Sequence, residues 1–470
     1  MPATMPGSTT SSNGLTSRSM VIFLAGATGM IGSRVADALI AAGHSVVCGV
    51  RDPAAAAPRL RGCRLVHVDF SGLRDVARMV PLLDGVDVVI NAVGIFNDAT
   101  GKDFRRLHTD APITLFKAAV AAGVRRIVQI SALGADASAR SPYHRSKLAA
   151  DEALLALPVS SLIVQPSLVF APEGRSTRFF AAWATLPVVP LPGAGTQRIQ
   201  PVHIDDVVEL IVAGALAAPA RDMSTTVTTG AGPLRRVAAV GKEPMTLKQY
   251  LTVLRRVAGS PPGWFLPMPM ALVRLATRVG ALLPGSLMSA DALAMLERGN
   301  VAPTDRFERV VGRAPRALSE MSVAQERFGT PARLMWLLPL LRASIAAVWI
   351  WTAIVSAGLY PRASSLELLA RVGAPVALAP LLLYGAALLD LAFGVLSLVW
   401  PRRLGPRAWL WTLQIVLIVL YTALISWRLP EFWLHPYGPL SKNLPMIALL
   451  ILLIQFDGQT GSPSNGVGKA

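Results

Sequence analysis

Cysteine and lysine are scarce in this chain of 470 residues. The two cysteines, Cys48 and Cys63, are too few for a disulfide framework and lack metal-ligand spacing, so we expect reduced thiols and no metal site. Only 7 of the 45 basic residues are lysine, and the 38 arginines form no stripe interleaved with aromatic residues. The absence of such a stripe argues against nucleic-acid binding. The formal net charge of +17 better suits a surface that faces anionic lipid headgroups.

Charge is also scarce, at 16% of residues against 53% hydrophobic, which excludes a disordered or highly solvated chain. The low content of charged residues is confined to the C-terminal part of the chain. From Leu337 onward there are 9 basic and 4 acidic residues among 134, against 36 and 24 in the first 336. Eight of the ten tryptophans lie at or beyond Trp336. Tryptophan beside long apolar runs is typical of membrane interfaces, so we expect a soluble part followed by a membrane-embedded part.

The soluble part alternates short Val/Ile-rich runs with amphipathic stretches. This pattern predicts an α/β fold with a Rossmann-like, doubly wound parallel sheet over residues 20–170 and a small substrate subdomain over 171–335, with some sheet-completing elements. Residues 1–19 and 458–470 are expected to be disordered. The expected strands are Val21–Ala25, Ser45–Val50, Arg64–Val68, Val86–Ala92, Arg126–Ser131 and Ser161–Gln165, and the expected helices are Ile31–Ala42, Leu73–Leu83, Ala111–Ala122 and Tyr143–Ala156.

In the later subdomain, Leu247–Ala258 is expected to be helical. The apolar stretch Trp264–Met288, with its two arginines, is interpreted as a subdomain helix, and a membrane-surface helix is the alternative.

Four apolar runs in residues 336–457 predict an all-α transmembrane four-helix bundle. They are Ala343–Tyr360, Val372–Trp400, Ala408–Trp427 and the shorter Leu444–Phe456. The connection Pro401–Arg407 carries three arginines in seven residues, and positive loops face the cytoplasm. We therefore expect a multi-pass protein of the inner (plasma) membrane with both termini cytoplasmic.

A glycine-rich segment follows the first expected strand and opens the first helix. Glycines there permit a tight turn and close backbone approach to a pyrophosphate, which the helix N-terminus attracts. The candidate dinucleotide-binding residues are Gly26, Thr28, Gly29, Met30, Ile31 and Gly32.

Residues that follow the second, third and fourth expected strands are candidates for contacts with the dinucleotide, and one of them distinguishes NADP from NAD. Arg51 suits the 2′-phosphate of NADP, although Asp52 beside it keeps NAD possible. Asp69 contacts the adenine or forms a turn. Small residues after the fourth strand let the backbone approach the cofactor, at Asn91, Ala92, Val93 and Gly94.

Tyr143 and Lys147 lie four residues apart, on one face of an expected helix. A lysine ammonium binds the ribose and lowers the pKa of the phenol, so that the tyrosine can act as general acid or base. Ser131, at the end of the preceding strand, is positioned to polarise a substrate carbonyl.

These segments together resemble the extended and atypical short-chain dehydrogenase/reductases, which include NAD-dependent epimerases and dehydratases. The similarity is greatest to the branch with NmrA-like proteins and an accessory subunit of respiratory complex I. The matching segments are GATGMIG from Gly26, NAVG from Asn91, QISALGA from Gln129, YHRSK from Tyr143, QPS including Pro166, and PVHIDDV from Pro201. The resemblance implies Tyr143 as acid/base, Lys147 as its partner and as a cofactor contact, Ser131 as carbonyl contact, and Pro166 near the cofactor.

The sequence departs from this family at His108, where many members have an active-site asparagine. The departure keeps two functions open. One is a membrane-anchored NAD(P)-dependent oxidoreductase or epimerase acting on a quinone, isoprenoid or lipid-linked substrate at the cytoplasmic face. The other is a non-catalytic NADP-binding module that stabilises or regulates a membrane respiratory or lipid-synthesis complex.

Residues from about 338 to 456 resemble a DoxX-like membrane domain. The matching residues are those of Trp349–Ser356, Asp390 and His435–Pro445. Asp390 is interpreted either as a polar clamp between helices or as a quinone, lipid or proton site, with Arg342, Gln414 and Tyr421 as expected partners. A small transport role for the bundle is a third, weaker hypothesis.

Overall fold

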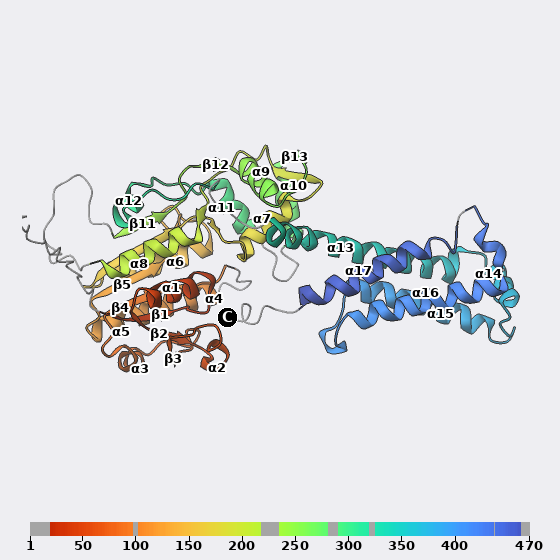
Figure 1. Ribbon diagram of the computed structural model, residues 1–470, viewed down its shortest axis with the longest axis horizontal. Helices are drawn as coiled ribbons and strands as arrows, with labels where there is room; N and C mark the ends of the chain where they lie inside the picture. Colours follow the sequence, from red (N-terminus) through yellow and green to blue (C-terminus); the bar gives the residue numbers. More distant parts are fainter. Residues whose placement is uncertain are drawn as a thin grey trace, which may run out of the picture.

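A computed structural model describes residues 19–96, 102–217, 235–280, 290–318, 325–436 and 438–461. Most of the two terminal segments expected to be disordered therefore lies outside the described residues. The molecule is elongated, with an α/β part at one end and a helix bundle at the other (Figure 1). Helix α13 (Gln325–Ile354) runs from the first part into the second.

The α/β part is built on one seven-stranded sheet in the order β11-β6-β5-β4-β1-β2-β3, and all its pairings are parallel. The strand order reverses between β1 and β4, and dinucleotides bind at this position in such sheets. The Rossmann-like fold is thus confirmed. The strands are β1 Val21–Ala25, β2 Ser45–Val50, β3 Arg64–His67, β4 Val88–Asn91, β5 Arg126–Ile130, β6 Ser160–Pro166 and β11 Arg236–Ala239.

Helices bury both faces of this sheet, as near-continuous apolar strands require. On one face, the core includes Val35, Ile211 and Phe307 from three helices, and on the other it includes Leu115 and Leu154. The first face carries α1 (Met30–Ala41), α8 (Ile204–Leu216) and α12 (Asp305–Val311); the second carries α3 (Val76–Met79), η1 (Val80–Leu83), α5 (Ala111–Ala121) and α6 (Pro142–Leu155). Further short helices of this part are α2 (Pro53–Ala56), α4 (Lys102–Phe104) and the π-helix η2 (Arg105–Asp110).

The subdomain packs around its own core, which includes Phe170, Tyr250 and Phe328. The prediction that Trp264–Met288 is one helix is wrong, because Trp264–Met268 pairs in parallel with Val188–Pro192 as a strand. A helix begins only at Met270, and residues 281–289 lie outside the described part. The elements are β7 (Val169–Phe170), α7 (Arg175–Ala184), β8 (Val188–Pro192), β9 (Arg198–Ile199), β10 (Val202–His203), β12 (Met245–Thr246), α9 (Leu247–Val257), β13 (Trp264–Met268), α10 (Met270–Gly280) and α11 (Ala290–Arg298).

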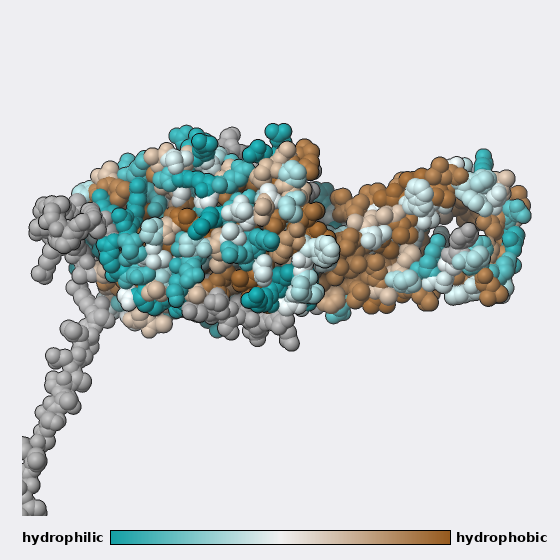
Figure 2. Space-filling model, turned by 90° about the horizontal axis from the view of Figure 1, so that it is seen from above, coloured by the Kyte–Doolittle hydropathy of each residue, from teal (hydrophilic) through white to brown (hydrophobic). Residues whose placement is uncertain are grey.

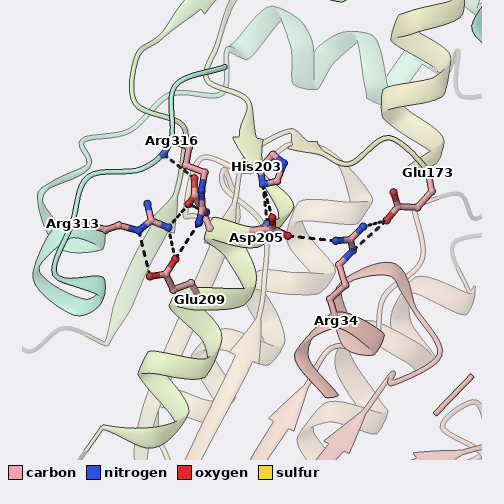
Figure 3. Close-up of polar contacts among 8 residues, drawn as sticks. Arg34, Glu173, His203, Asp205, Glu209, Arg313 and Arg316 are labelled. Carbon is pink, nitrogen blue, oxygen red and sulfur yellow. Dashed lines mark hydrogen bonds and ion pairs between the residues drawn. The ribbon is translucent and has the colours of Figure 1, made fainter. Parts of the chain in front are cut away.

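A polar network at the start of α8 joins segments that are distant in sequence (Figure 3). Asp206 is fully buried, and it pairs with the guanidinium groups of Arg313 (2.6 Å) and Arg316. On the neighbouring side, Arg34 of α1 pairs with Glu173 and Asp205. Because Asp206 is buried, loss of its arginine partners would leave an uncompensated buried charge, so the PVHIDDV segment has a structural role here.

Among the residues that the structure describes, three helices are long and apolar enough to cross a membrane, and they span Phe328–Leu359, Ala379–Leu398 and Ala408–Arg428. The predicted span Val372–Trp400 begins too early, because Gly373 ends a separate helix in the left-handed conformation and Pro375 follows. The helices after α13 are the π-helix η4 (Val355–Leu359), α14 (Arg362–Val372), α15 (Ala379–Leu398), η5 (Arg402–Leu404), α16 (Ala408–Arg428), η6 (Pro430–Trp433) and α17 (Asn443–Gly461).

Candidate active site

The loop between β1 and α1 brings backbone directly against backbone. Gly26 has a φ of 77°, and a Cβ there would lie 2.6 Å from the carbonyl carbon of Ala92. A Cβ on Gly32 would lie 2.2 Å from the carbonyl oxygen of Gly26. Only glycine allows this approach at either position, so the loop is shaped by its sequence.

The N-terminus of α1 opens onto this loop. Gly29 is the N-cap and supplies no side-chain cap, so the first N–H groups of the helix are available to an anion. Those groups belong to Met30, Ile31 and Gly32, and Thr28 is partly exposed on the same turn. The cradle fits the pyrophosphate of a dinucleotide.

Arg51 and Asp69 follow β2 and β3, on the same sheet edge as the glycine loop. Their side chains form an ion pair of 3.5 Å between Nε and Oδ1. Asp69 also accepts hydrogen bonds from the hydroxyl (2.7 Å) and the backbone N–H of Ser71, and these bonds lower the pKa of its carboxyl. Asp69 thus forms a turn, and it holds Arg51 at the end of the sheet where the adenosine half of a dinucleotide binds.

The segment Asn91–Gly94 carries the chain from β4 over the glycine loop. The Asn91 side chain is fully buried, donates to Gln129 (2.7 Å) and accepts from the Val93 N–H (3.2 Å). Its observed role is to shape this turn. Ala92 and Val93 are partly exposed and Gly94 is exposed, so their backbone is the part that can approach a cofactor.

Lys147 of α6 is buried beneath this turn. Its ammonium donates to the carbonyl oxygens of Val93 (3.1 Å) and Ile130 (3.2 Å). Burial lowers the pKa of Lys147 to about 8, and the nearby Asp151 carboxylate opposes that shift. The lysine therefore joins the end of β5 to the turn after β4.

Tyr143 lies one helical turn earlier, among aromatic rings. Its ring centroid is 5.4 Å from that of Phe96, 5.9 Å from Phe104 and 5.5 Å from His108. Burial raises the pKa of Tyr143 to about 12. The expectation that Lys147 lowers this pKa is wrong for this structure, because the ammonium turns toward backbone carbonyls and desolvation dominates.

The sequence did not single out Asp151. It is fully buried one helical turn beyond Lys147, and Ser131 donates to its Oδ2 (2.5 Å). Burial raises the pKa of Asp151 to about 6, and the Ser131 hydrogen bond and Lys147 oppose the rise. Ser131 thus contacts Asp151, the carboxylate that interacts with the Lys147 ammonium. The role of Ser131 as a contact of the substrate carbonyl stays a prediction. The signal was available, since Lys147 and Asp151 are spaced i, i+4.

His108 lies in the π-helical turn η2 (Arg105–Asp110), an irregularity common at functional sites. Its Nε2 accepts from the Ile95 N–H (2.9 Å), and its Nδ1 lies 3.0 Å from the Ser146 hydroxyl, which donates to the Tyr143 carbonyl (2.8 Å). These partners assign the proton to Nδ1. Because burial lowers its pKa to about 2, His108 stays neutral and holds the Tyr143 helix against the loop after β4.

The loop after β5 closes the site on its other side. Pro166, at the end of β6, is buried, and its carbonyl accepts from the Leu133 N–H (2.9 Å). Arg298, the last residue of α11, donates to the Gly134 carbonyl (2.8 Å) and pairs with Asp136 (2.5 Å). The end of α11 therefore fixes the loop that follows Ser131.

A cavity of about 170 Å³ lies where the soluble part meets α13. Its lining includes Glu173 and Ala181 on one side and Phe328, Pro331 and Ala332 of α13 on the other. Gly174 borders the glycine loop, since a Cβ there would lie 3.1 Å from the sulfur of Met30. The cavity thus lies between the cofactor cradle and the first membrane helix.

In the bundle, Asp390 is buried on α15, and no described hydrogen bond reaches its Oδ1. Two of its expected partners bind elsewhere. Gln414 binds Trp349 (2.8 Å) and Ser397 (3.1 Å), and Arg342 pairs with Asp457. Tyr421 is the expected partner that interacts electrostatically with Asp390.

Asp457, near the end of α17, is the centre of a cluster of charged side chains at the end of the bundle nearest the soluble part. It pairs with Arg342 and Arg407 (3.6 Å) and accepts from the Trp411 indole (3.1 Å). Paired and hydrogen-bonded in this way, the carboxylate can be buried.

Comparison with known families identifies both parts. Residues 22–225 match the NAD dependent epimerase/dehydratase family, and residues 346–451 match the DoxX-like family. The chain therefore combines an NAD-dependent epimerase/dehydratase-family domain with a C-terminal DoxX-like membrane domain, as the sequence resemblance predicted.

Individual relatives match over about two fifths of the chain. The chain is 32% identical over 195 residues to a ceramide reductase from Caulobacter vibrioides, covering 41% of this chain and 60% of that protein. It is 29% identical over 194 residues to mouse mitochondrial NADH dehydrogenase [ubiquinone] 1 alpha subcomplex subunit 9, covering 40% and 51%. The chain thus spans between about half and three fifths of these curated relatives.

Solved structures agree on the fold. A nucleoside-diphosphate-sugar epimerase from Staphylococcus aureus has a TM-score of 0.50 at 19% identity, covering 66% of this chain and 100% of that one. An epimerase from Methanothermobacter thermautotrophicus has a TM-score of 0.50 at 15% identity, covering 68% and 94%.

Proposed function

We propose that this protein is a membrane-anchored NAD(P)-dependent oxidoreductase or epimerase that acts on a lipophilic substrate. The observation that carries the proposal is the joint placement of the glycine cradle, Lys147 and Tyr143 around one sheet edge, with a cavity between that edge and a membrane helix. The bound dinucleotide supplies hydride chemistry. The protein's own residues bind and orient the cofactor and move a proton at the Tyr143 hydroxyl.

The proposed roles follow the contacts. The first N–H groups of α1 hold the pyrophosphate, and the Lys147 ammonium, lying under Gly94, reaches the ribose. Tyr143 donates or accepts the proton at the substrate oxygen. Its high pKa keeps the phenol protonated at neutral pH, which suits a proton donor in reduction.

A lipophilic substrate is supported by the similarity to a protein named ceramide reductase, and by α13, which runs from this part directly into the DoxX-like membrane domain. The substrate class we propose is a quinone, an isoprenoid or a lipid-linked carbonyl or alcohol. Tethering the site to the bilayer raises its effective concentration near a membrane-dissolved substrate.

The proposed cofactor is NADP, because Arg51 lies at the end of β2 where a 2′-phosphate would bind. Purified protein in detergent is titrated with NADPH and NADH and then assayed with short-chain quinones and lipid carbonyls. We expect tighter binding of NADPH. Arg51→Ala should weaken NADPH about tenfold and NADH little, since a charge-assisted phosphate contact contributes about 1.5–3 kcal/mol. Arg59→Ala, another exposed arginine, is the control. Equal binding of both nucleotides by the unaltered protein contradicts the NADP assignment.

The proposed location is the inner (plasma) membrane, with both termini in the cytoplasm. The end of α17 lies at the end of the bundle nearest the soluble part (Figure 1), and Arg407 lies there too, paired with Asp457. In inverted and right-side-out vesicles, a cysteine placed at Arg403 should react with a membrane-impermeant thiol reagent only from the cytoplasmic side. Labelling from the outside would contradict this orientation.

A second candidate is a non-catalytic NADP-binding module in a membrane complex. The similarity to a subunit of mitochondrial NADH dehydrogenase favours it. The two functions separate in the same assay, because the module binds NADPH without turning over any carbonyl or quinone.

A further inference from the structure

We propose that strand β13, helix α10 and the adjoining start of β8 form a second membrane contact, which lies in the headgroup layer of the bilayer. We call this the β13–α10 surface and define it by Val188, Trp264, Leu266, Leu272 and Leu275. Its occupant is lipid with anionic headgroups. It lies outside both the candidate active site and the helices that cross the membrane.

The exposed hydrophobic side chains of the soluble part gather here. Among the described residues before α13, seven large hydrophobic side chains are exposed, and five of them form this surface; the other two are Phe96 and Val301. Trp264 is 81% exposed, and it pairs in register with Val188. Clustering of this kind marks an interaction site, whereas single exposed apolar residues are ordinary.

Both elements turn their apolar residues outward. Along β13, Trp264 and Leu266 are exposed, while Phe265 between them packs against the subdomain core. Along α10, Leu272 and Leu275 are exposed, and Val273 and Thr277 are buried. The outer face of α10 is thus an apolar stripe, beside the exposed Arg274 and Arg278, which is the pattern of a helix lying in a membrane interface.

Hydrogen bonds fix this surface to α13 just before that helix enters the bundle. Arg333 donates to the carbonyl oxygens of Ala258 and Gly259, both at 2.8 Å. A Cβ on Gly329 would lie 2.2 Å from the Ala258 oxygen. The chain enters β13 at Trp264, a few residues after Gly259, so the start of this strand is held near α13.

A second contact relates the surface to the part of α13 that enters the bundle. The Trp336 indole donates to Thr185 (3.2 Å), and Pro187, two residues later, accepts from the Trp264 N–H (3.4 Å). Arg342, in the charge cluster at the end of the bundle, lies six residues beyond Trp336, about 9 Å along the helix. The headgroup region is about 5–8 Å thick in each leaflet, so with Arg342 at its inner boundary Trp336 lies close to its outer edge. Trp264 is linked to that level through residues 185–187.

The position of β13 and α10 in the molecule agrees with a membrane contact. β13 and α10 lie at the end of the soluble part from which α13 leaves (Figure 1). Figure 2 shows hydrophobic surface at this end of the soluble part meeting the hydrophobic surface of the bundle. A bilayer around the bundle would meet this end first.

The surface is also joined to the active site. Arg274 of α10 pairs with Glu297 of α11 (3.2 Å), and the next residue, Arg298, holds the loop after β5 through Gly134 and Asp136. We infer that a lipophilic substrate enters beside this helix pair. This step rests on the proposed function, whereas the membrane contact itself does not.

Spin labels test the contact in the full-length protein, reconstituted in vesicles of phosphatidylethanolamine and phosphatidylglycerol. Labels are placed by Leu272→Cys or Leu275→Cys in a Cys63→Ser background, with Asp84→Cys as the exposed control on the turn after η1. We expect collisions with a water-soluble nickel chelate to be about tenfold rarer at 272 and 275 than at 84, because the chelate partitions poorly into lipid. Collisions with oxygen, which dissolves in lipid, should be more frequent there than at 84.

Two results overturn the proposal. Labels at 272 and 275 that meet the chelate as often as the label at 84 lie in water. Labels shielded from both reagents are covered by protein, which assigns the surface to contact between copies of the chain. NADPH binding by each labelled variant shows that it is folded.

A kinetic test addresses the entry step separately. The double substitution Leu272→Gln and Leu275→Gln should raise KM about tenfold for a long-chain substrate in the bilayer and leave kcat/KM for a short, water-soluble analogue unchanged. Equal effects on both substrates overturn the entry step. Absence of turnover in the unaltered protein overturns the proposed function and leaves the spin-label result standing.

Discussion

Replacing Tyr143 by phenylalanine is expected to lower turnover by about two to four orders of magnitude, the range typical of a lost general acid or base. The substitution removes one hydroxyl and keeps the ring, which packs near Phe96, Phe104 and His108. NADPH affinity should change less than about threefold, because the glycine cradle and Lys147 are untouched. The measurements are steady-state turnover with the best substrate and fluorescence titration of NADPH.

Tyr250→Phe is the matched control. Tyr250 is fully buried in the subdomain core, and its hydroxyl has no described hydrogen-bond partner. Removing that hydroxyl should therefore leave turnover within about twofold. Turnover that survives in Tyr143→Phe would show that another group moves the proton, and equal losses in both variants would point to damaged packing.

The parallel sheet could be predicted well because local patterns determine most of it. Strands β1 and β2 were placed to the residue, since buried parallel strands give unbroken Val/Ile-rich runs. Strand β11 could not be found in this way. Its four residues, Arg236–Ala239, pair with β6 more than 70 positions earlier, and nothing in so short a run indicates that partner.

Local pattern misled the prediction at β13. The segment Trp264–Met268 is apolar and continues into a helix, so its periodicity cannot separate strand from helix. Its pairing with β8 decides the outcome, and both strands contain proline, which suits strands at the edge of a sheet. The membrane contact depends on this pairing, because it brings Val188 beside Trp264.

Site residues could be predicted where their spacing in the sequence is characteristic. They could not be predicted where their role depends on a contact with a residue distant in the sequence. The glycine loop and the Tyr143–Lys147 pair were found from spacing. The Ser131–Asp151 contact joins the end of β5 to α6, and it required the fold. Likewise, hydropathy ended the last apolar run at Phe456, whereas α17 continues to Gly461 and includes Asp457, which pairs with Arg342 and Arg407.

Replacing Gly32 by alanine is expected to weaken NADPH binding about 100-fold or more, equivalent to about 2.7 kcal/mol. The new Cβ would lie 2.2 Å from the Gly26 carbonyl oxygen and 2.9 Å from its carbon, so backbone has to move. Gly26 cannot yield toward the sheet, because it already packs against the backbone of Ala92 and Val93. The shift must therefore fall on the loop and the first turn of α1, whose N–H groups face the pyrophosphate.

Gly43→Ala, just beyond the other end of α1, separates this effect from a general loss of stability. Gly43 has a φ of 83°, and a Cβ there would meet nothing within 4 Å. Alanine at this position costs about 1–2 kcal/mol of backbone strain. Both variants should lower the Tm of the soluble part by a few degrees, but only Gly32→Ala should lose NADPH binding. If both variants bind NADPH normally, the pyrophosphate does not lie on the α1 N-terminus, and the assignment of this loop fails even though the sheet around it is correct.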